Sequence, residues 1–498
     1  MDRTRLVVDP AYTIAPVDPR IFGGFLEHIG RAVYEGVYDP QSRYADENGY
    51  RQDALAALRK LQMTTMRYPG GNFASGYHWM DGVGPREKRP SVYDQAWESI
   101  EPNHFGTDEF LKLARLMNWT PMLTVNLGTG APEEARNWVE YCNAPVGSQY
   151  ANLRAENGSV DPYNVKLWCL GNEIDGHWQM GHAPADDYAD RAHRAAKLMK
   201  EVDPDIETVA CGSTTMSGST YINWDLTVLE HLGPYADYVS LHRYVGNPEN
   251  DTADYLACGA SVDKRIEHMD AVCRVVQAKT RSKKRHYLCF DEWNVWYRAN
   301  GPEDTKGHGK FAPPLIEEAY NLEDALVVAG FLNSFIRHAD SVKIANLAQI
   351  VNVLAPIRTR GDDLLLQSIY YPFAMFSCRQ EGVSIQPVVI GPAYDSPSYG
   401  RVNYIDASAI LGDGALHVFM VNRHLSEAAE VEINYGGEAI ESILSAEVVF
   451  GSNPKETNTF ESPSQVIRRP LKSGVVREGK AIIQLPALSV AAITFRIP

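Results

Sequence analysis

The sequence predicts an α/β protein in which a (β/α)8 TIM barrel is followed by a C-terminal all-β sandwich that resembles a jelly roll. Short β-rich segments alternate with helical patterns from about residue 20 to residue 370. Beyond about residue 373 the β-rich segments follow one another, with Gly, Asn and Pro between them and no long helix. The chain has 498 residues, more than one hydrophobic core commonly supports. We therefore expect the barrel over residues 17–372 and the sandwich over residues 373–498.

Eight segments are the predicted barrel strands, and helical spacing of apolar residues appears between most of them. The strands are expected at residues 22–29, 63–69, 121–127, 165–173, 208–212, 238–244, 287–292 and 342–349. Clear amphipathic helices are expected over residues 53–61, 108–117 and 186–202, of which the last two begin with acidic residues that favour a helix N-terminus. A doubly wound sheet is the alternative, but no glycine-rich phosphate loop follows the first strand.

The predicted sandwich contains six segments of strand type. They cover residues 402–409, 415–422, 429–434, 445–450, 481–485 and 491–497. Residues 5–14 have the same character and precede the barrel. We expect residues 1–16 to add a strand to the sandwich, so that the two ends of the chain lie together.

Composition excludes several classes of partner. The net charge is -16, from 47 basic and 63 acidic residues, which disfavours nucleic acids and anionic membranes. No window reaches the roughly 18 apolar residues of a membrane-spanning helix, and residues 1–8 lack the apolar segment of a secretion signal. Three of the seven cysteines, Cys169, Cys211 and Cys289, lie in predicted core strands, which favours buried free thiols in the cytoplasm over a disulfide framework. Zinc-type Cys/His spacing is absent from the sequence, so we expect no metal and no other cofactor.

Two apolar runs that each end in a glutamate are the most informative feature for chemistry. Glu173 follows the run that starts at Val165, and Glu292 follows the run that starts at His286. A carboxylate at the end of an apolar strand costs free energy unless it is paired or used. Because the C-terminal ends of barrel strands meet at one rim, the two carboxylates should face each other. A facing pair of carboxyl groups is the arrangement that cleaves glycosidic bonds.

The remaining residues at the predicted strand ends make a polar rim with many amides and little positive charge. They are Glu27, Arg67, Asn72, Asn126, Asn172, His242, Tyr244, Asn346 and Gln349. Such a rim can hydrogen-bond several sugar hydroxyls, whereas a phosphate site would need more basic residues. Structural alternatives stay open for three of these residues: Arg67 as a counter-ion of a neighbouring carboxylate, Glu27 as the partner of Arg67, and His242 as a hydrogen-bonded core residue. Asp291 is expected to cap a turn or to face the barrel exterior.

Three motifs give the chain a family resemblance. They are Phe22-Gly-Gly-Phe-Leu-Glu-His28, Arg67-Tyr-Pro-Gly-Gly-Asn-Phe73 and Trp168-Cys-Leu-Gly-Asn-Glu173, and residues 97–106, 241–244, 291–294 and 345–349 extend the match. With these motifs the chain resembles glycoside hydrolase family 51, the α-L-arabinofuranosidases, over essentially its whole length. The motif that ends at Glu173 is shared by a broad clan of retaining glycosidases, but its combination with Arg-Tyr-Pro-Gly-Gly-Asn is specific.

The resemblance implies an exo-acting, retaining enzyme that removes terminal α-L-arabinofuranosyl groups from arabinan, arabinoxylan or arabino-oligosaccharides. It implies that Glu173 is the general acid/base and Glu292 the nucleophile, supported by Tyr244 and Arg67. The substrate-binding residues implied are Glu27, Asn72, Asn172, Tyr244 and Gln349 around the furanose, with Phe25, Trp97, Trp178 and Trp296 shaping the pocket. It also implies a homo-oligomer, commonly a hexamer.

A retaining mechanism makes physical demands on the pair. The two carboxyl groups should lie roughly 5–5.5 Å apart, with Glu292 ionised and Glu173 protonated at the start. We expect the long segment of residues 297–314 to border the leaving-group side. An endo-acting β-glucanase or xylanase of the same clan and a catalytically silent carbohydrate-binding protein are the alternatives. A metal-dependent hydrolase using His28, His242, Glu173 and Glu292 is a further one, although no strand carries the His-x-His pair common in such barrels.

Overall fold

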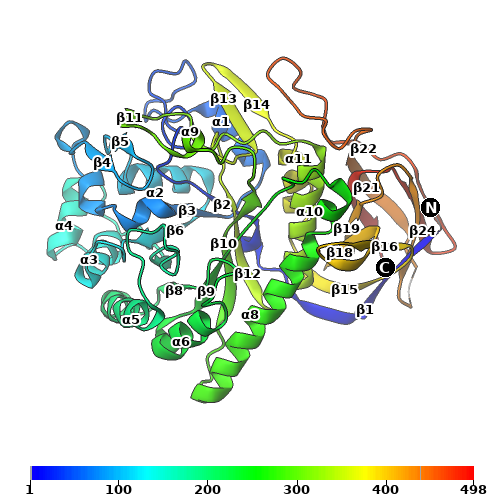
Figure 1. Ribbon diagram of the computed structural model, residues 1–498, viewed down its shortest axis with the longest axis horizontal. Helices are drawn as coiled ribbons and strands as arrows, with labels where there is room; N and C mark the ends of the chain where they lie inside the picture. The colour runs from blue at the N-terminus through cyan, green and yellow to red at the C-terminus, as the bar shows by residue number, and fades with distance from the viewer. Residues whose placement is uncertain (1–2, 438) are drawn as a thin grey trace.

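The computed structural model describes residues 3–437 and 439–498 and contains a closed parallel barrel beside a large, mostly antiparallel sheet (Figure 1). Barrel strands follow each other around the ring in the order β10-β12-β2-β3-β6-β7-β8-β9. Their bounds are β2 Gly23–Phe25, β3 Thr65–Tyr68, β6 Thr120–Val125, β7 Leu167–Leu170, β8 Glu207–Cys211, β9 Tyr238–Val245, β10 Tyr287–Val295 and β12 Val342–Ala348. Each predicted barrel strand overlaps one of these eight, and the predicted fold class is confirmed.

The three amphipathic helices that were predicted form as α1, α2 and α5, and further helices lie around the barrel. Their bounds are α1 Gln52–Lys60, α2 Thr107–Met117, α3 Pro132–Asn143, α4 Gln149–Glu156, α5 Ala185–Val202, α6 Asn223–Leu232, α7 Thr252–Leu256, α8 Gly259–Thr280, α9 Pro302–Thr305, α10 Leu322–Arg337 and α11 Tyr370–Ser377. In α2, Leu111 and Ala114 belong to the buried side of an amphipathic helix, and Asn118 ends it in the left-handed conformation typical of a C-cap. None of the described helices is long and apolar enough to cross a membrane.

Apolar side chains fill the lower part of the barrel interior. Met122, Leu167, Cys169, Val209 and Ile344 belong to this small core and are almost completely buried. Because this layer closes the N-terminal end of the barrel, side chains beyond it reach solvent only at the C-terminal ends of the strands. The cysteines predicted to be buried are buried and free.

The C-terminal part is one strongly curved sheet with the strand order β22-β21-β25-β19-β18-β15-β1-β20-β24-β23. Its strands are β1 Thr4–Pro16, β15 Val383–Ile390, β18 Ile405–Gly412, β19 Ala415–Asn422, β20 Ala429–Tyr435, β21 Ser442–Phe450, β22 Arg469–Pro470, β23 Gly474–Arg477, β24 Lys480–Leu485 and β25 Ser489–Arg496. The sheet folds on itself, because Gly474 of β23 lies against Ile443 of β21, and it encloses a separate apolar core. β15, β22 and β23 were not predicted from the sequence.

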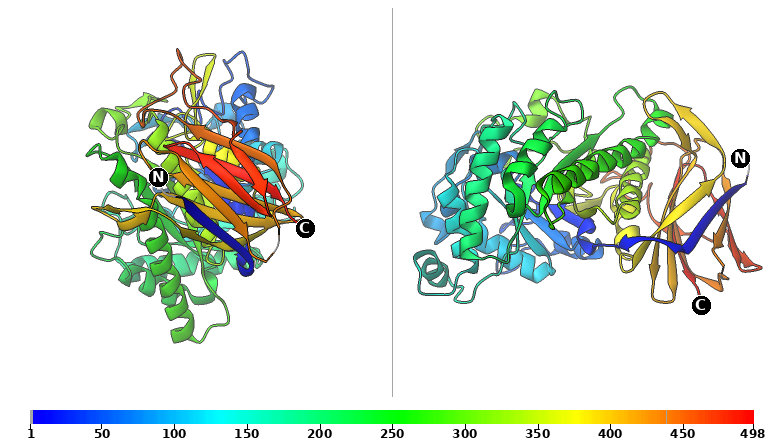
Figure 2. Two further views of the ribbon diagram at one scale, coloured as in Figure 1. Left: turned by 90° about the vertical axis from the view of Figure 1, so that its right-hand side faces the viewer. Right: turned by 90° about the horizontal axis from the view of Figure 1, so that it is seen from below.

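Strand β1 comes from the N-terminal part of the chain but lies within the C-terminal sheet, as Figure 2 shows. It pairs antiparallel with β15 and parallel with β20, with Thr4 opposite Val431. The terminal residues 1–2, which belong to the predicted strand region, lie outside the described residues. The predicted boundary between residues 372 and 373 falls inside α11, so we retain the domain limits only as a proposal.

Helices α10 and α11 connect the barrel to the curved sheet. α10 is buried on all sides, as expected of a helix that is apolar around its whole circumference. The Phe376 ring of α11 stacks on Phe419 of β19 with ring centroids 4.2 Å apart. Asn333 and Arg337 of α10 bind the Asp406 carboxylate of β18 at 2.7 and 3.0 Å. The contact is therefore an apolar layer with a buried polar anchor.

Short strands decorate the loops above and beside the barrel. Three of them form a small sheet, namely β4 Val92–Asp94, β5 Ser99–Glu101 and β11 Lys310–Phe311. Two further hairpins are β13 Ile357–Arg360 with β14 Asp363–Leu366, and β16 Ala393–Ser396 with β17 Gly400–Asn403. The three-stranded sheet lies next to the C-terminal ends of the barrel strands, where the functional site is found.

Candidate active site

A cavity of about 700 Å³ opens at the C-terminal ends of the barrel strands. The predicted site residues that line it are Glu27, Asn72, Trp97, Glu173, Trp178, Tyr244, Glu292, Trp296 and Gln349. Arg67, Phe25 and Asn172 do not line it, and neither do Asn126 and Asn346 of the predicted rim. His242 of the predicted rim also lines the cavity, and Arg243, Arg265 and Lys306, which were not predicted, complete the wall.

Glu173 does not end its strand, contrary to the prediction from the apolar run. β7 stops at Leu170, because Gly171 has a φ of 87°, which a strand cannot accommodate. Glu173 itself has a φ of 48°, an uncommon conformation that costs free energy in a non-glycine residue and is found at functional sites. Its two oxygens accept hydrogen bonds from His242 Nδ1 at 2.7 Å and from Trp178 Nε1 at 2.7 Å.

Glu292 lies within a strand and not at its end, because β10 continues to Val295. The pairing of β10 with β9 and with β12 is irregular around Asp291 and Glu292, which marks a β-bulge. With the bulge, two successive carboxylates face the barrel interior instead of opposite faces. The prediction that Asp291 caps a turn or faces outward is therefore wrong: it is 1% exposed and accepts a hydrogen bond from Ser240 at 2.5 Å.

Arg67 forms the floor beneath the pair of glutamates. Its Nη1 donates to Glu292 Oε1 at 2.6 Å and its Nη2 donates to Asn172 Oδ1 at 2.7 Å, while Nε lies 3.4 Å from Asp291 Oδ2. The Phe25 ring packs against the guanidinium with 4.6 Å between the ring centroid and the guanidinium carbon. Phe25 thus supports the floor and does not contact the cavity, because Arg67 covers it. On the other side, Tyr244 donates to Glu292 Oε2 at 2.9 Å.

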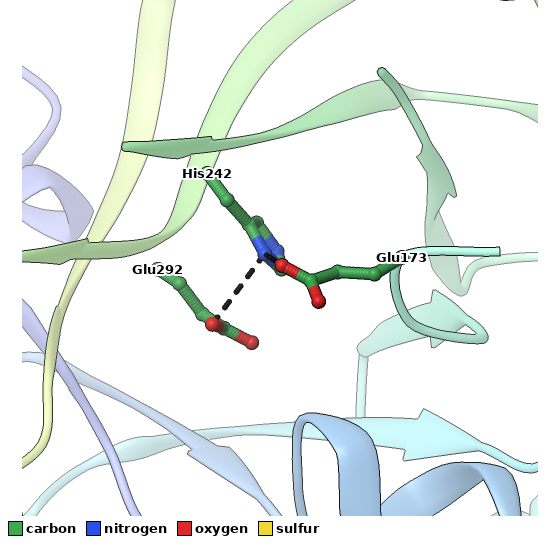
Figure 3. Close-up of side chains that lie close together, drawn as sticks. All are labelled: Glu173, His242 and Glu292. Carbon is green, nitrogen blue, oxygen red and sulfur yellow. Dashed lines mark hydrogen bonds and ion pairs between the residues drawn. The ribbon is translucent and has the colours of Figure 1, made fainter. Parts of the chain in front are cut away.

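His242 lies between the two glutamates (Figure 3). Its Nδ1 is 2.7 Å from Glu173 Oε1 and 3.4 Å from Glu292 Oε2, and its Nε2 is 3.3 Å from Asp291 Oδ1. The facing atoms of Glu173, His242 and Glu292 all lie within 4.8 Å of one another. The sequence did carry a signal for this position: His242 stands two residues before Tyr244 on one strand, so both side chains face the same side.

The charges of this cluster shift its titration. Burial alone would lower the pKa of His242, but the charges of Glu292 and Asp291 raise it to about 10. Burial raises the pKa of Glu292 above its ordinary value, although His242 and Arg67 oppose this shift. Burial also acts on Glu173, yet the hydrogen bond and charge of His242 hold its pKa below its ordinary value. The proton expected on Glu173 from the sequence thus resides on the neighbouring imidazole.

Glu27 occupies a separate position on the cavity wall. Its Oε1 accepts from Phe73 N and Trp97 Nε1, both at 3.0 Å, and its Oε2 accepts from Gln349 Nε2 at 3.2 Å. Glu27 forms no ion pair with Arg67 among the described residues, so the salt-bridge alternative is wrong. Burial and the charge of Glu292 raise the pKa of Glu27 to about 8, so this carboxyl is largely protonated near neutral pH.

The outer wall of the cavity is aromatic and includes the segment after β10. Trp178 is 48% exposed, and the Trp296 ring packs edge-on against Tyr244 with centroids 5.6 Å apart. In the segment of residues 297–314, Gly307 N donates to Trp97 O at 2.7 Å and Lys306 pairs with Glu98 at 2.6 Å. This segment therefore borders the cavity and is hydrogen-bonded to the loop that carries Trp97.

The cluster of Glu173, His242 and Glu292 has the side-chain types of a metal site, but its oxygen atoms are already engaged. Each of the four glutamate oxygens already accepts a hydrogen bond, from His242, Trp178, Arg67 or Tyr244. The Arg67 cation lies directly behind Glu292, and His28, also considered as a ligand, is bonded to Glu101 and Tyr68 instead. These partners fit a pair of free carboxylates better than a set of metal ligands.

Comparisons with known proteins agree with this geometry. A family model described as the α-L-arabinofuranosidase C-terminal domain matches residues 291–489, and one described as the α-L-arabinofuranosidase 1 domain matches residues 57–257. The intracellular exo-α-(1→5)-L-arabinofuranosidase 1 of Bacillus subtilis is 45% identical over 96% of both chains. The chain belongs to the family 51 α-L-arabinofuranosidases, which are glycoside hydrolases.

Two proteins of Bifidobacterium longum add to this assignment. An exo-α-(1→6)-L-arabinofuranosidase is 38% identical over 99% of this chain and 97% of its own length. The solved structure of a family 51 α-L-arabinofuranosidase from that organism superposes with a TM-score of 0.95 at 34% identity, with both chains covered completely. The family resemblance inferred from the three sequence motifs is thereby confirmed.

Proposed function

We propose that this exo-acting α-L-arabinofuranosidase works by retaining double displacement, with Glu292 as nucleophile and Glu173 as general acid/base. The observation that carries the proposal is the short distance between the facing carboxylate oxygens, at most 4.8 Å. Retaining enzymes hold their carboxyl groups about 5–5.5 Å apart, whereas inverting enzymes need roughly 6.5–9.5 Å to admit a water molecule. The alternative of an endo-acting glucanase or xylanase is not favoured, since the relatives are exo-acting arabinofuranosidases.

In the first step, ionised Glu292 attacks the anomeric carbon and the bond to the leaving oxygen breaks. Arg67 and Tyr244 hold Glu292 in its ionised form by one hydrogen bond to each oxygen. Glu173 gives its proton to the leaving oxygen, so the aglycone departs as a neutral alcohol. The products of this step are the glycosyl ester of Glu292 and an ionised Glu173.

His242 supplies the proton that Glu173 donates. The proton crosses the 2.7 Å hydrogen bond from Nδ1 to Glu173 Oε1, which leaves a neutral imidazole. Asp291 faces Nε2 at 3.3 Å and accepts from its N–H, so the lone pair of the neutral ring points toward Glu173. The cluster therefore reaches its catalytic protonation state without taking up a proton from solvent.

In the second step, Glu173 removes a proton from water, and the resulting hydroxide attacks the anomeric carbon. The ester bond to Glu292 breaks and arabinose leaves with its original anomeric configuration. The proton that Glu173 took from water passes back to His242 Nδ1, so the imidazole and both glutamates return to their starting states. Two inversions at one carbon account for the retention.

The furanose is held by the inner wall of the cavity. Glu27 is largely protonated near neutral pH, so it can both donate to and accept from a sugar hydroxyl. Asn72 and Gln349 add amide groups beside it, and the Asn172 Nδ2 group makes only a 3.3 Å contact with Asn72 Oδ1. Asn172 does not line the cavity, so we propose its bond to the 2-hydroxyl only for the case in which substrate binding releases Nδ2 from Asn72; that bond would strengthen toward the transition state. Trp97, Trp178 and Trp296 shape the sides and the leaving-group end.

Finer properties follow from the relatives as proposals. The Bacillus subtilis relative, named for (1→5) linkages, is more similar than the Bifidobacterium longum relative named for (1→6) linkages, so we propose a preference for α-(1→5)-linked arabino-oligosaccharides. Arabinose release from the two linkage isomers, measured as kcat/KM, tests it. We also propose a cytoplasmic location, because several relatives are named intracellular. A homo-oligomer, commonly a hexamer in this family, is proposed and is tested by light scattering.

The roles of the two glutamates are tested by azide rescue. Glu173→Ala should retain activity on substrates with good leaving groups, respond to azide and give an azide product of retained configuration. Glu292→Ala should give, with azide, a product of inverted configuration. Glu303→Ala, which changes an exposed glutamate near the cavity, is the matched control and should behave like the unchanged enzyme. Exchanged product configurations would reverse the assignment, and an inverted natural product would exclude double displacement.

A further inference from the structure

The part of the cavity wall next to Glu173 carries residues that the hydrolytic mechanism does not use, and we call this part the lobe. Thr214 and Thr215 from the loop after β8, Arg243 of β9 and Arg265 of α8 line this lobe. It lies on the acid/base side, because Asp175, two residues after Glu173, accepts a hydrogen bond from Thr214 N at 2.8 Å. Trp178, which donates to Glu173, lines the same cavity. The lobe is thus placed where a leaving group extends away from the furanose.

Arg265 is a buried cation without an anionic partner. It is 1% exposed, and its Nη2 donates only to the carbonyl oxygens of Ser213 and Thr214, at 2.5 and 3.0 Å. Its Nε is buried and has no hydrogen-bond partner. Within residues 3–437 and 439–498, no carboxylate forms an ion pair with it. A buried guanidinium in this condition carries a large desolvation cost.

Arg243, a neighbour of Arg265, also has few hydrogen-bond partners. Its Nη2 donates to Ser261 Oγ at 2.8 Å, its Nε is buried without a partner, and it too lacks an ion pair in the described part of the chain. The neighbouring acids are engaged elsewhere: Asp225 accepts from Ser213 N and Oγ, and Asp175 accepts from Thr214. Burial lowers the pKa of Arg265 to about 10; the charge of Arg243 acts in the same direction, while Tyr221, Asp225 and Asp175 oppose this shift. Two cations with unused donors therefore face one lobe of the cavity.

We propose that this lobe is a leaving-group subsite that binds the carboxylate of an aglycone carrying a uronic acid. Guanidinium groups bind carboxylates through paired N–H donors, and an anion there would compensate the buried charge of Arg265 and the half-buried charge of Arg243. The ligand is a sugar acid and not a free ion, because the lobe continues from the point where the leaving oxygen departs. The inference rests on the proposed function, since it takes Glu173 to mark the leaving-group side. It predicts a preference for arabinofuranosyl groups attached to acidic glycans.

Two synthetic substrates that differ in the charge of the leaving group test this subsite. The enzyme is assayed with 4-(carboxymethyl)phenyl α-L-arabinofuranoside and with its methyl ester, whose phenols leave with similar ease. The unchanged enzyme should have a higher kcat/KM for the acid than for the ester. In Arg265→Gln and in Arg243→Gln this acid-to-ester ratio should fall about tenfold, the value of one hydrogen-bonded charge contact of about 1.4 kcal/mol. Arg274→Gln changes an arginine on the outer side of α8 and should keep the ratio.

A general loss of activity affects both substrates equally, so it does not change the acid-to-ester ratio of kcat/KM. Because Arg265 and Arg243 are replaced in separate variants, the test remains possible if one variant folds poorly. An acid-to-ester ratio near one in the unchanged enzyme, or the same ratio in all variants, would overturn the subsite. Inhibition of ester hydrolysis by inorganic phosphate, without inhibition by glucuronate and without acid preference, would assign the lobe to a free anion and also overturn the proposal. Competitive inhibition by glucuronate but not by glucose would support it. If neither substrate is hydrolysed, the proposed function itself fails, and the subsite with it.

Discussion

Replacing His242 by glutamine should narrow the pH profile of kcat/KM from both sides. His242 places a positive charge 3.4 Å from Glu292 Oε2, and two such charges attract by about 5 kcal/mol at an effective dielectric constant of about 20. The substitution also removes the cation that keeps Glu173 ionised, so Glu173 takes up the proton itself. The facing oxygens of the two glutamates are at most 4.8 Å apart, so the lost repulsion between them amounts to at least about 3.5 kcal/mol.

The difference of at most about 1.4 kcal/mol disfavours ionised Glu292 and corresponds to a shift of up to about one pH unit. Because Glu292 must be ionised to attack, the acidic limb of the profile should move to higher pH by this amount. The basic limb should move to lower pH, because the transferable proton, held on His242 with a pKa of about 10, would then be held by a carboxylic acid alone. Initial rates on p-nitrophenyl α-L-arabinofuranoside between pH 4 and pH 10.5 measure both limbs.

Tyr244→Phe is the control for this experiment. It removes a neutral hydrogen-bond donor from Glu292 and leaves the shared proton of His242 and Glu173 in place. The acidic limb of the Tyr244→Phe profile should therefore move to higher pH, while its basic limb should keep its position. The reasoning is refuted if the His242→Gln profile superposes on that of the unchanged enzyme, or if its two limbs move in the same direction.

Three further outcomes are expected. Glu27, with its pKa raised to about 8, destabilises the fold increasingly as the pH rises from about 4.3 to 8. Urea unfolding should thus show Glu27→Gln gaining about 2–5 kcal/mol relative to the unchanged protein between pH 4.5 and pH 9, and a pH-independent difference would contradict the assigned protonation. Trp178→Phe keeps a ring but loses the 2.7 Å hydrogen bond to Glu173, so kcat/KM should fall about tenfold on arabinobiose and less on the p-nitrophenyl substrate; equal losses on both would argue against a role at the acid/base. Phe376→Ala removes the ring stacked on Phe419 and should lower the free energy of unfolding by about 3–5 kcal/mol. A denaturation midpoint unchanged by Phe376→Ala would mean that the two parts of the chain do not depend on this contact.

The barrel could be predicted from the sequence because each strand carries its own signal. Apolar runs of strand length and the amphipathic helices between them are local properties, and short connections determine which strands are neighbours. Strands β22 and β23 escaped prediction because they are short and largely exposed. Their formation depends on pairing with β21 and β24, a contact that no local pattern encodes.

In the functional site, too, some features follow from local sequence and others depend on contacts between distant segments. Residues at strand ends, such as Glu27 and Gln349, could be assigned to the rim because the barrel brings all strand ends together. The inward turn of Asp291 could not be predicted, since it results from a bulge set by two neighbouring strands. The position of Phe25 behind Arg67, outside the cavity, could not be predicted either. Which of two stacked side chains faces the cavity depends on packing and not on sequence position.

The position of β1 between β15 and β20 has a consequence for how the chain is made. Thr4 pairs with Val431, so β1, which leaves the ribosome before the barrel, must wait for a strand that is made after the barrel. At roughly 5–20 residues per second, this strand stays unpaired for about 20–80 seconds while the entire barrel is synthesised. The barrel can assemble in that time, but the curved sheet cannot. The order of synthesis therefore imposes an order of folding, in which the catalytic part forms first and the sheet is completed last by a strand that was present from the start.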